Sequence, residues 1–164
     1  MNKMKLVFPI YLLLAVGLAG SVVMAQKQTA QNRFVAELSG EQAGSKSPGG
    51  GEAIFLLAND GQVLNFKLTV RGVKGVTMAH IHLGKPGKEG PPVVWLYPAA
   101  PPPKLKKGVF HGVLAHGSFT AKNLQGPLEG KSIEELVKEI KADNAYVMVH
   151  SEEYPTGAIR GQIK

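Results

Sequence analysis

Residues 51–70 read GEAIFLLANDGQVLNFKLTV, and this stretch decides the fold. In its second half, residues 62–70, four apolar side chains alternate with side chains that face out: Leu64, Phe66, Leu68 and Val70. A period of two is typical of a strand buried on one face, and a shift of one residue would expose all four apolar groups. NDG at residues 59–61 is a tight-turn signal. Residues 52–70 are therefore predicted to form an antiparallel hairpin.

Short alternating runs of this kind, broken by Gly, Pro and Asn, continue on both sides of the hairpin. Besides the strand at 62–70, strands are predicted at residues 33–39, 52–58, 76–83, 93–97, 109–120, 145–151 and 158–163. Eight strands suffice for two packed sheets. The sequence therefore predicts an all-β, antiparallel sandwich.

One helix is predicted, in KSIEELVKEIKAD at residues 131–143. Ser132 is expected to cap the free amides of the first turn, and Glu135 is expected to complete a capping box. The helix would then present one apolar stripe that closes an end of the sandwich: Ile133, Leu136, Val137 and Ile140.

The first residues are typical of a secretory signal peptide. Two lysines and a long apolar run occupy residues 3–20, and the small side chains of Val23 and Ala25 fit cleavage after Ala25. An uncleaved membrane anchor is the alternative, and we favour cleavage. Residues 1–25 are thus predicted as signal peptide and 26–164 as one domain, with no membrane span after cleavage. The expected location is secreted, periplasmic or extracellular.

Composition limits the function. The chain has no cysteine, so packing alone must stabilise the exported domain, and cysteine-based metal sites are excluded. The formal net charge is +7, but the lysines are scattered apart from KLKK at residues 104–107, and no aromatic platform lies among them. Nucleic-acid binding therefore has little support. We expect a solvated basic surface that attracts an anionic envelope polymer or a protein partner, neither of which the sequence names.

MAHIHLG at residues 78–84 places two of the five histidines at alternate positions of a predicted strand. Side chains two residues apart project to the same face, so His80 and His82 are expected to point together. Two imidazoles on one strand are a common donor pair for Zn, Cu, Ni or Fe. His150, in YVMVHS at residues 146–151, is the third candidate ligand.

Each histidine strand also carries a methionine, because Met78 precedes His80 by two residues and Met148 precedes His150 by two. Thioether and imidazole together favour copper, particularly Cu(I), whereas magnesium and calcium require oxygen ligands. The alternative is that the histidines form hydrogen bonds at a sheet edge and the methionines fill gaps in the core. Both interpretations stay open for the histidines, and the structural one is favoured for the methionines.

Three other polar residues are weighed as members of a functional site: His111, His116 and Arg160. His111 and His116 are separated by an odd number of positions, which puts them on opposite faces of a regular strand, and both are predicted as surface residues. Arg160, in GAIRGQI at residues 157–163, is expected to clamp a carboxylate. That carboxylate is either a ligand's or, as we favour, one of the domain's own, such as Glu37, Glu52 or Glu153.

The residues so far resemble a known family, the CHRD domain, first described in chordin and widespread in secreted bacterial proteins. The resemblance runs through FVAELSGEQ at 34–42, residues 51–97, residues 126–151 and GAIRGQI at 157–163. Its landmarks are AHIH-G, YV-VH and G-IRGQI, which occur here in that order.

Carried over position by position, the family pattern implies functional or structural roles for His80, His82, Gly84, Gly90, His150, Arg160 and Gly161. This chain departs from the pattern at two positions. Met148 stands where the family often has Asn, which adds a soft atom beside the histidines. Ala158 stands where the family often has Glu, which removes a carboxylate near Arg160 and puts an internal Glu–Arg pair in doubt.

HIH followed by a distant third histidine also looks like the copper site of Cu,Zn superoxide dismutases, which are Greek-key sandwiches. This likeness is an analogy, and the zinc site and disulfide of those enzymes have no match here. The predicted fold class is accordingly an antiparallel Greek-key β-sandwich, immunoglobulin-like or superoxide-dismutase-like, with one short helix.

We favour a non-enzymatic exported binding module with a polar or metal-binding site at His80, His82 and His150, for which copper or zinc is the candidate ion. A copper-binding redox protein or superoxide-dismutase-like metalloenzyme is the first alternative, so enzymatic activity stays open. A pH-responsive structural domain is the second, because clustered imidazoles repel one another once protonated.

Overall fold

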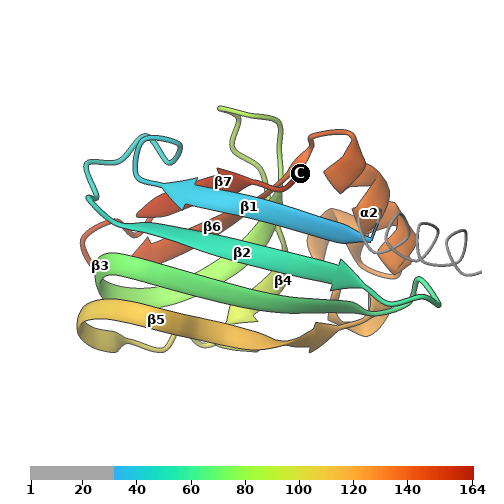
Figure 1. The fold of residues 1–164 in the computed structure, drawn as a ribbon, viewed down its shortest axis with the longest axis horizontal. Helices are drawn as coiled ribbons and strands as arrows, with labels where there is room; N and C mark the ends of the chain where they lie inside the picture. The colour runs from blue at the N-terminus through green and yellow to red at the C-terminus, as the bar shows by residue number, and fades with distance from the viewer. Residues whose placement is uncertain (1–31) are drawn as a thin grey trace, which may run out of the picture. The chain divides into compact units, whose positions relative to one another are not determined.

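The computed structural model describes residues 32–164 (Figure 1). The predicted signal peptide at residues 1–25 and its cleavage site lie outside the described residues. Within residues 32–164, no helix has both the length and the apolar character needed to cross a membrane.

The described part of the chain contains seven strands and one α-helix. The strands are β1 Arg33–Ser39, β2 Gly50–Leu57, β3 Leu64–Leu83, β4 Pro92–Tyr97, β5 Lys106–Phe119, β6 Ala145–Ser151 and β7 Ile159–Gln162. The helix is α2 Ile133–Lys141, and two 3-10 turns precede it, η1 Ala121–Asn123 and η2 Gly126–Leu128.

The main difference from the predicted strands concerns β3. The two strands predicted at 62–70 and 76–83 are the halves of one strand of 20 residues. Gly72 and Gly75 lie between them with φ of 70° and 63°, a conformation that glycine adopts without strain. The pairing of β3 with β5 shifts register at both glycines, so each marks an irregularity within a continuous strand and not a turn.

Strand order shows how β3 organises the fold. The sheet runs β2-β1-β7-β6-β3-β4, with β5 added on β3, and β2 also pairs with β3. Every pairing is antiparallel. The first half of β3 pairs with β2 and β5, whereas the second half pairs with β6 and β4. Strands β1, β2, β3, β6 and β7 therefore close into a ring.

This closure corrects the predicted architecture. The antiparallel all-β class with one short helix is confirmed, but the strands form one continuous closed sheet and are not divided into two sheets of a Greek-key sandwich. The physical reason is the length of β3, which continues past its glycines and so hydrogen-bonds to strands on both sides of the ring. Figure 1 shows β5 beside β3 and α2 at one end of the sheet.

The core lies inside the ring. Leu64, Leu68 and Val70 are fully buried, as the alternating pattern predicts. Phe66 is only half-buried, and its ring packs against Phe55 and Phe119 with centroids 6.5 and 6.0 Å away. The predicted apolar stripe of α2 is buried as well: Ile133, Leu136, Val137 and Ile140.

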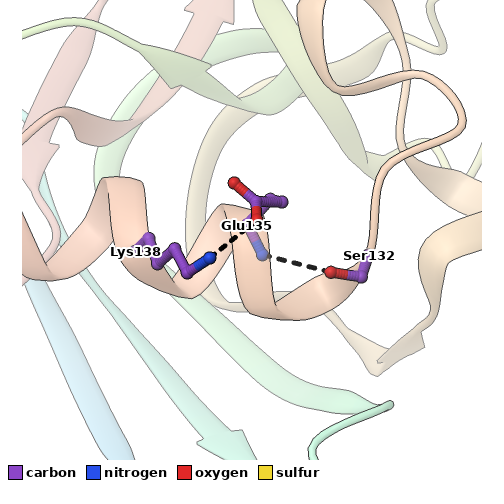
Figure 2. A network of polar contacts seen from close by, with 3 residues as sticks. All are labelled: Ser132, Glu135 and Lys138. Carbon is purple, nitrogen blue, oxygen red and sulfur yellow. Dashed lines mark hydrogen bonds and ion pairs between the residues drawn. The ribbon is translucent and has the colours of Figure 1, made fainter.

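The N-terminus of α2 forms half of the predicted capping box (Figure 2). The backbone N–H of Glu135 donates to Ser132 Oγ at 3.4 Å. The Glu135 carboxylate does not turn back to the cap but accepts from Lys138 Nζ at 2.8 Å. Both members of this ion pair are solvent-exposed, so Ser132 is the residue that stabilises the helix end.

Candidate metal centre

Two neighbouring strands build the site. Strands β3 and β6 pair so that His80 lies opposite Met148, His82 opposite Tyr146 and Met78 opposite His150. The intervening residues are fully buried in the core: Ala79, Ile81, Val147 and Val149. Strict alternation thus directs the apolar side chains into the ring and gathers the polar ones on the outer face of β3 and β6.

On that face the three predicted histidines lie together. Each offers one ring nitrogen, and these nitrogens all lie within 4.8 Å of one another. His80 Nδ1 is 3.3 Å from His150 Nε2. The ring centroids of His82 and His150 are 5.9 Å apart. The structure therefore brings His80, His82 and His150 into one cluster, as the alternation and the separate position of His150 predict.

Backbone carbonyls fix two of the three rings. His82 Nδ1 lies 2.9 Å from the Gly90 carbonyl oxygen, and His150 Nδ1 lies 2.9 Å from that of Pro155. Because a carbonyl oxygen only accepts, each Nδ1 must carry a proton and donate. The neutral ring then has its lone pair on Nε2, which is the tautomer and the second-shell contact that metal-ligating histidines use.

Burial leaves two nitrogens without a partner. The three histidines are 4%, 8% and 6% exposed in chain order. Among the described residues, His80 Nε2 and His82 Nε2 are buried and have no hydrogen-bond partner. Buried polar atoms are nearly always satisfied, because leaving one unpaired is costly. The two nitrogens are thus oriented donors that a bound cation would satisfy.

The surroundings of the cluster keep the imidazoles neutral. Burial, together with the smaller effects of the His150 and His82 charges, lowers the pKa of His80 from 6.5 to about 3. Burial also lowers the pKa of His82 to about 4, against the opposing hydrogen bond to Gly90. The pKa of His150 is lowered by burial and raised by its bond to Pro155, with a net decrease. Neutral imidazole is the form that ligates metals.

Aromatic rings enclose the cluster, which the sequence did not indicate. The Trp95 ring of β4 lies edge-on to His80, with centroids 4.2 Å apart. The Tyr146 ring stacks on His82 at 5.1 Å and 15°. Tyr146 Oη also accepts from the Gly90 N–H at 3.1 Å, which ties the loop after β3 to the ring. These rings exclude water and hold the imidazoles in place.

Gly90 has a steric reason for its identity. A Cβ at this position would overlap the Leu83 carbonyl. Any side chain would therefore push away the loop whose carbonyl oxygen holds His82. Gly161 is similar, because a Cβ there would overlap the Glu37 carbonyl of the neighbouring strand β1. Both are positions that the family resemblance marks.

The two methionines share the face of the histidines. Met148 is 4% exposed and lies directly opposite His80, with its sulfur against Gly157. Met78 is half-buried opposite His150. Directly paired residues on one face of an antiparallel sheet have their Cβ atoms about 4.5–5.5 Å apart. His80 and His150 are therefore each paired with a methionine, whereas His82 is paired with Tyr146.

The other two histidines lie elsewhere. His111 and His116 are exposed on β5, opposite Arg71 and Lys67 of β3. The register between β3 and β5 shifts once between them, so the strand is not regular here and both side chains point outward with their basic partners. Both are surface residues, as predicted. They make no contribution to the cluster.

Arg160 has no carboxylate partner among the described residues, so the predicted internal clamp by Glu37, Glu52 or Glu153 is not found. The side chain is nevertheless 4% exposed. Its Nη2 donates to the Lys85 carbonyl oxygen at 2.9 Å and to Gln162 Oε1 at 3.4 Å. The guanidinium carbon lies 3.6 Å from the centroid of the Tyr146 ring.

Comparison with known proteins agrees with the resemblance seen in the sequence. The family model described as CHRD domain matches residues 34–163. No curated protein and no solved structure gave a match. Because the family match spans nearly all of the described residues, from β1 to the residue after β7, this chain belongs to the CHRD domain family.

Proposed function

We propose that this chain is an exported, non-enzymatic binding module whose His80, His82 and His150 hold one copper or zinc ion. One observation carries the proposal. The three histidines each bring one ring nitrogen within 4.8 Å of the others, and two of them also have a buried Nε2 without a partner. A metal site requires nitrogens that are neutral, oriented and shielded from water. A histidine cluster with a purely structural role does not, because its buried nitrogens would be hydrogen-bonded.

The donor set favours copper, and Cu(I) above the divalent ions. The cluster of metal-ligating side chains in the described residues contains histidines and no carboxylate. Three neutral ligands leave the whole charge of the ion buried, and the cost of burying charge grows with the square of that charge. A monovalent ion is therefore the least costly occupant. Met148, the residue paired with His80, would add a thioether, a soft donor that Cu(I) accepts.

Strand β5 supports the role of a binding module. It hydrogen-bonds to β3 and to no other strand of the described chain, so its second edge is free. Val109 and Val113 are 57% and 44% exposed on it. Lys106 and Lys107 lie at its start. A free edge of this kind accepts an added strand from a protein partner, and its lysines attract anionic segments of a protein or an envelope polymer.

Metal content tests the proposal. The full chain is expressed in an export-competent host, and the purified protein is analysed by mass spectrometry beside His80→Ala, His150→Ala and the control His116→Ala. We expect near-stoichiometric copper or zinc in the wild type and the control, and none in the other two variants. Circular dichroism establishes that all four proteins are folded.

Absence of metal from the wild type, even after reconstitution with Cu(I) and with Zn(II), would make the histidines structural.

The alternative of a copper redox protein or superoxide-dismutase-like enzyme is tested on the copper-loaded protein. Superoxide turnover above that of free copper would establish that the protein is an enzyme. Turnover equal to that of free copper would support a non-enzymatic binding module.

A further inference from the structure

Beside the histidine cluster, a surface pocket of about 440 Å³ opens over β7. The residues that line it come from three segments: Ser39, Glu41 and Gln42 at the end of β1, Pro86 and Gly87 after β3, and Arg160 and Gln162 of β7. Strand β7 pairs with β6, the strand of His150. The pocket therefore occupies the same side of the sheet as the cluster but uses other residues.

Arg160 is the only cation that lines this pocket. Its Nη2 bonds to a carbonyl and to an amide oxygen, both neutral. Within the described residues, Nε and Nη1 have no hydrogen-bond partner, which leaves three of the five guanidinium donors unused. A guanidinium keeps its charge in proteins, and its free N–H groups favour an anionic acceptor. The pocket thus holds a guanidinium that makes no ion pair with the described residues.

The guanidinium is also held in place before any ligand binds. The Tyr146 ring covers one of its faces at 3.6 Å. Gln162 is fixed because its Nε2 donates to the carbonyl oxygens of Gly84 at 2.9 Å and Asp143 at 2.8 Å. Its Oε1 then orients Nη2. A pre-organised donor loses little entropy on binding, which raises affinity.

A second donor lies next to Arg160. Ser39 is its direct partner in the pairing of β1 with β7. Ser39 Oγ accepts from the Gln42 N–H at 3.2 Å, and among the described residues its own hydroxyl proton has no acceptor. Gln42 Nε2 donates one proton to the Glu37 carbonyl oxygen at 2.7 Å and keeps the other. Hydroxyl, amide and guanidinium donors therefore surround one pocket.

We propose that this pocket binds a carboxylate group of an exogenous ligand through Arg160 and Ser39. A carboxylate is favoured over a dianionic phosphate because the exposed Glu41 also lines the pocket and repels a second negative charge. Glu41 is itself the rival occupant, since a movement of its loop would bring its carboxylate to Arg160. The inference does not depend on the proposed metal.

The test uses metal-free protein made from the full chain, dialysed after chelation, at constant ionic strength. Acetate, inorganic phosphate and chloride are titrated in turn, and the ¹H–¹⁵N signals of Arg160 Nε and of Ser39 are followed. We expect saturable shifts with acetate, weaker binding of phosphate, and no saturation with chloride. Arg160→Gln should abolish acetate binding, and Ser39→Ala should weaken it about tenfold, the effect of one hydrogen bond to a charged group.

Glu41→Gln separates the two occupants. We expect this substitution to strengthen acetate binding several-fold, because it removes a like charge from the pocket. Acetate binding that is seen only in Glu41→Gln would identify Glu41 as the native occupant and overturn the proposal. Phosphate binding tighter than acetate, or equal saturation by chloride, would overturn it too. Ser39→Ala keeps the test valid if Arg160→Gln does not fold.

Discussion

Acidification of the metal-free protein is the perturbation that the histidine cluster predicts most sharply. The pKa of His80 is lowered to about 3 and that of His82 to about 4, whereas both titrate near 6.5 in the unfolded chain. The folded state thus binds fewer protons than the unfolded state below pH 6.5. The stability that this gives is fully present above pH 6.5 and is lost as the pH falls toward the folded pKa values.

The magnitude follows from linkage. A histidine that is neutral when folded and titrates at 6.5 when unfolded costs about 2 kcal/mol of stability between pH 7 and pH 5. His80 and His82 together therefore give a loss of about 4 kcal/mol, and His150 adds to it in the same direction. Typical domains have about 5–15 kcal/mol in all, so the effect is large. This pH range, from 7 to 5, lies above the pH range in which ordinary carboxylates become protonated.

Urea denaturation at pH 7 and at pH 5 measures this loss. The matched variant is the double substitution His80→Gln, His82→Gln. Its free energy of unfolding should fall between pH 7 and pH 5 by about 4 kcal/mol less than that of the wild type. The control His116→Gln alters an exposed histidine and should behave as the wild type. Equal stability of the wild type at both pH values, or the same loss in the double variant, would refute the assignment of buried neutral imidazoles.

Four further substitutions test the histidine cluster and the elements around it. Gly90→Ala forces a methyl group onto the Leu83 carbonyl and should lower both metal affinity and stability, the latter by about 1–3 kcal/mol in urea denaturation. Ser132→Ala removes the cap of α2 and should cost about 1 kcal/mol, whereas Glu135→Gln, which breaks an exposed ion pair, should leave the thermal midpoint unchanged. Met148→Leu should lower the affinity for Cu(I) in a competition assay and leave the affinity for Zn(II) unchanged. A Cu(I) affinity equal to that of the wild type would show that the thioether is not a ligand.

The strands were predictable because alternation is a local property. The order of residues alone predicts that Leu64, Leu68 and Val70 are buried on one face. It predicts for the same reason that His80 and His82 share a face. The union of two predicted strands into β3 was not predictable, because glycine at 72 and 75 is also a turn signal. Closure of the sheet is decided by which strands meet in space, and the alternation of side chains carries no such information.

The same division holds for the site. The sequence identified the three histidines but not their orientation, which depends on carbonyl oxygens of Gly90 and Pro155 in loops outside the strands. It also favoured an internal carboxylate for Arg160, because an arginine can clamp a carboxylate bidentately and the domain has glutamates of its own. Ala158 at a position where the family often has Glu was the available signal that the partner is missing.

Tyr146 joins the two proposed sites. Its ring stacks on His82 on one side and carries the Arg160 guanidinium on the other. The positive charge of Arg160 already disfavours a charged His82, and it opposes a cation bound to His82 in the same way. A carboxylate at Arg160 would neutralise that charge. The two proposals together therefore predict that acetate strengthens metal binding and that the metal strengthens acetate binding by the same factor, because coupling between two binding sites is reciprocal.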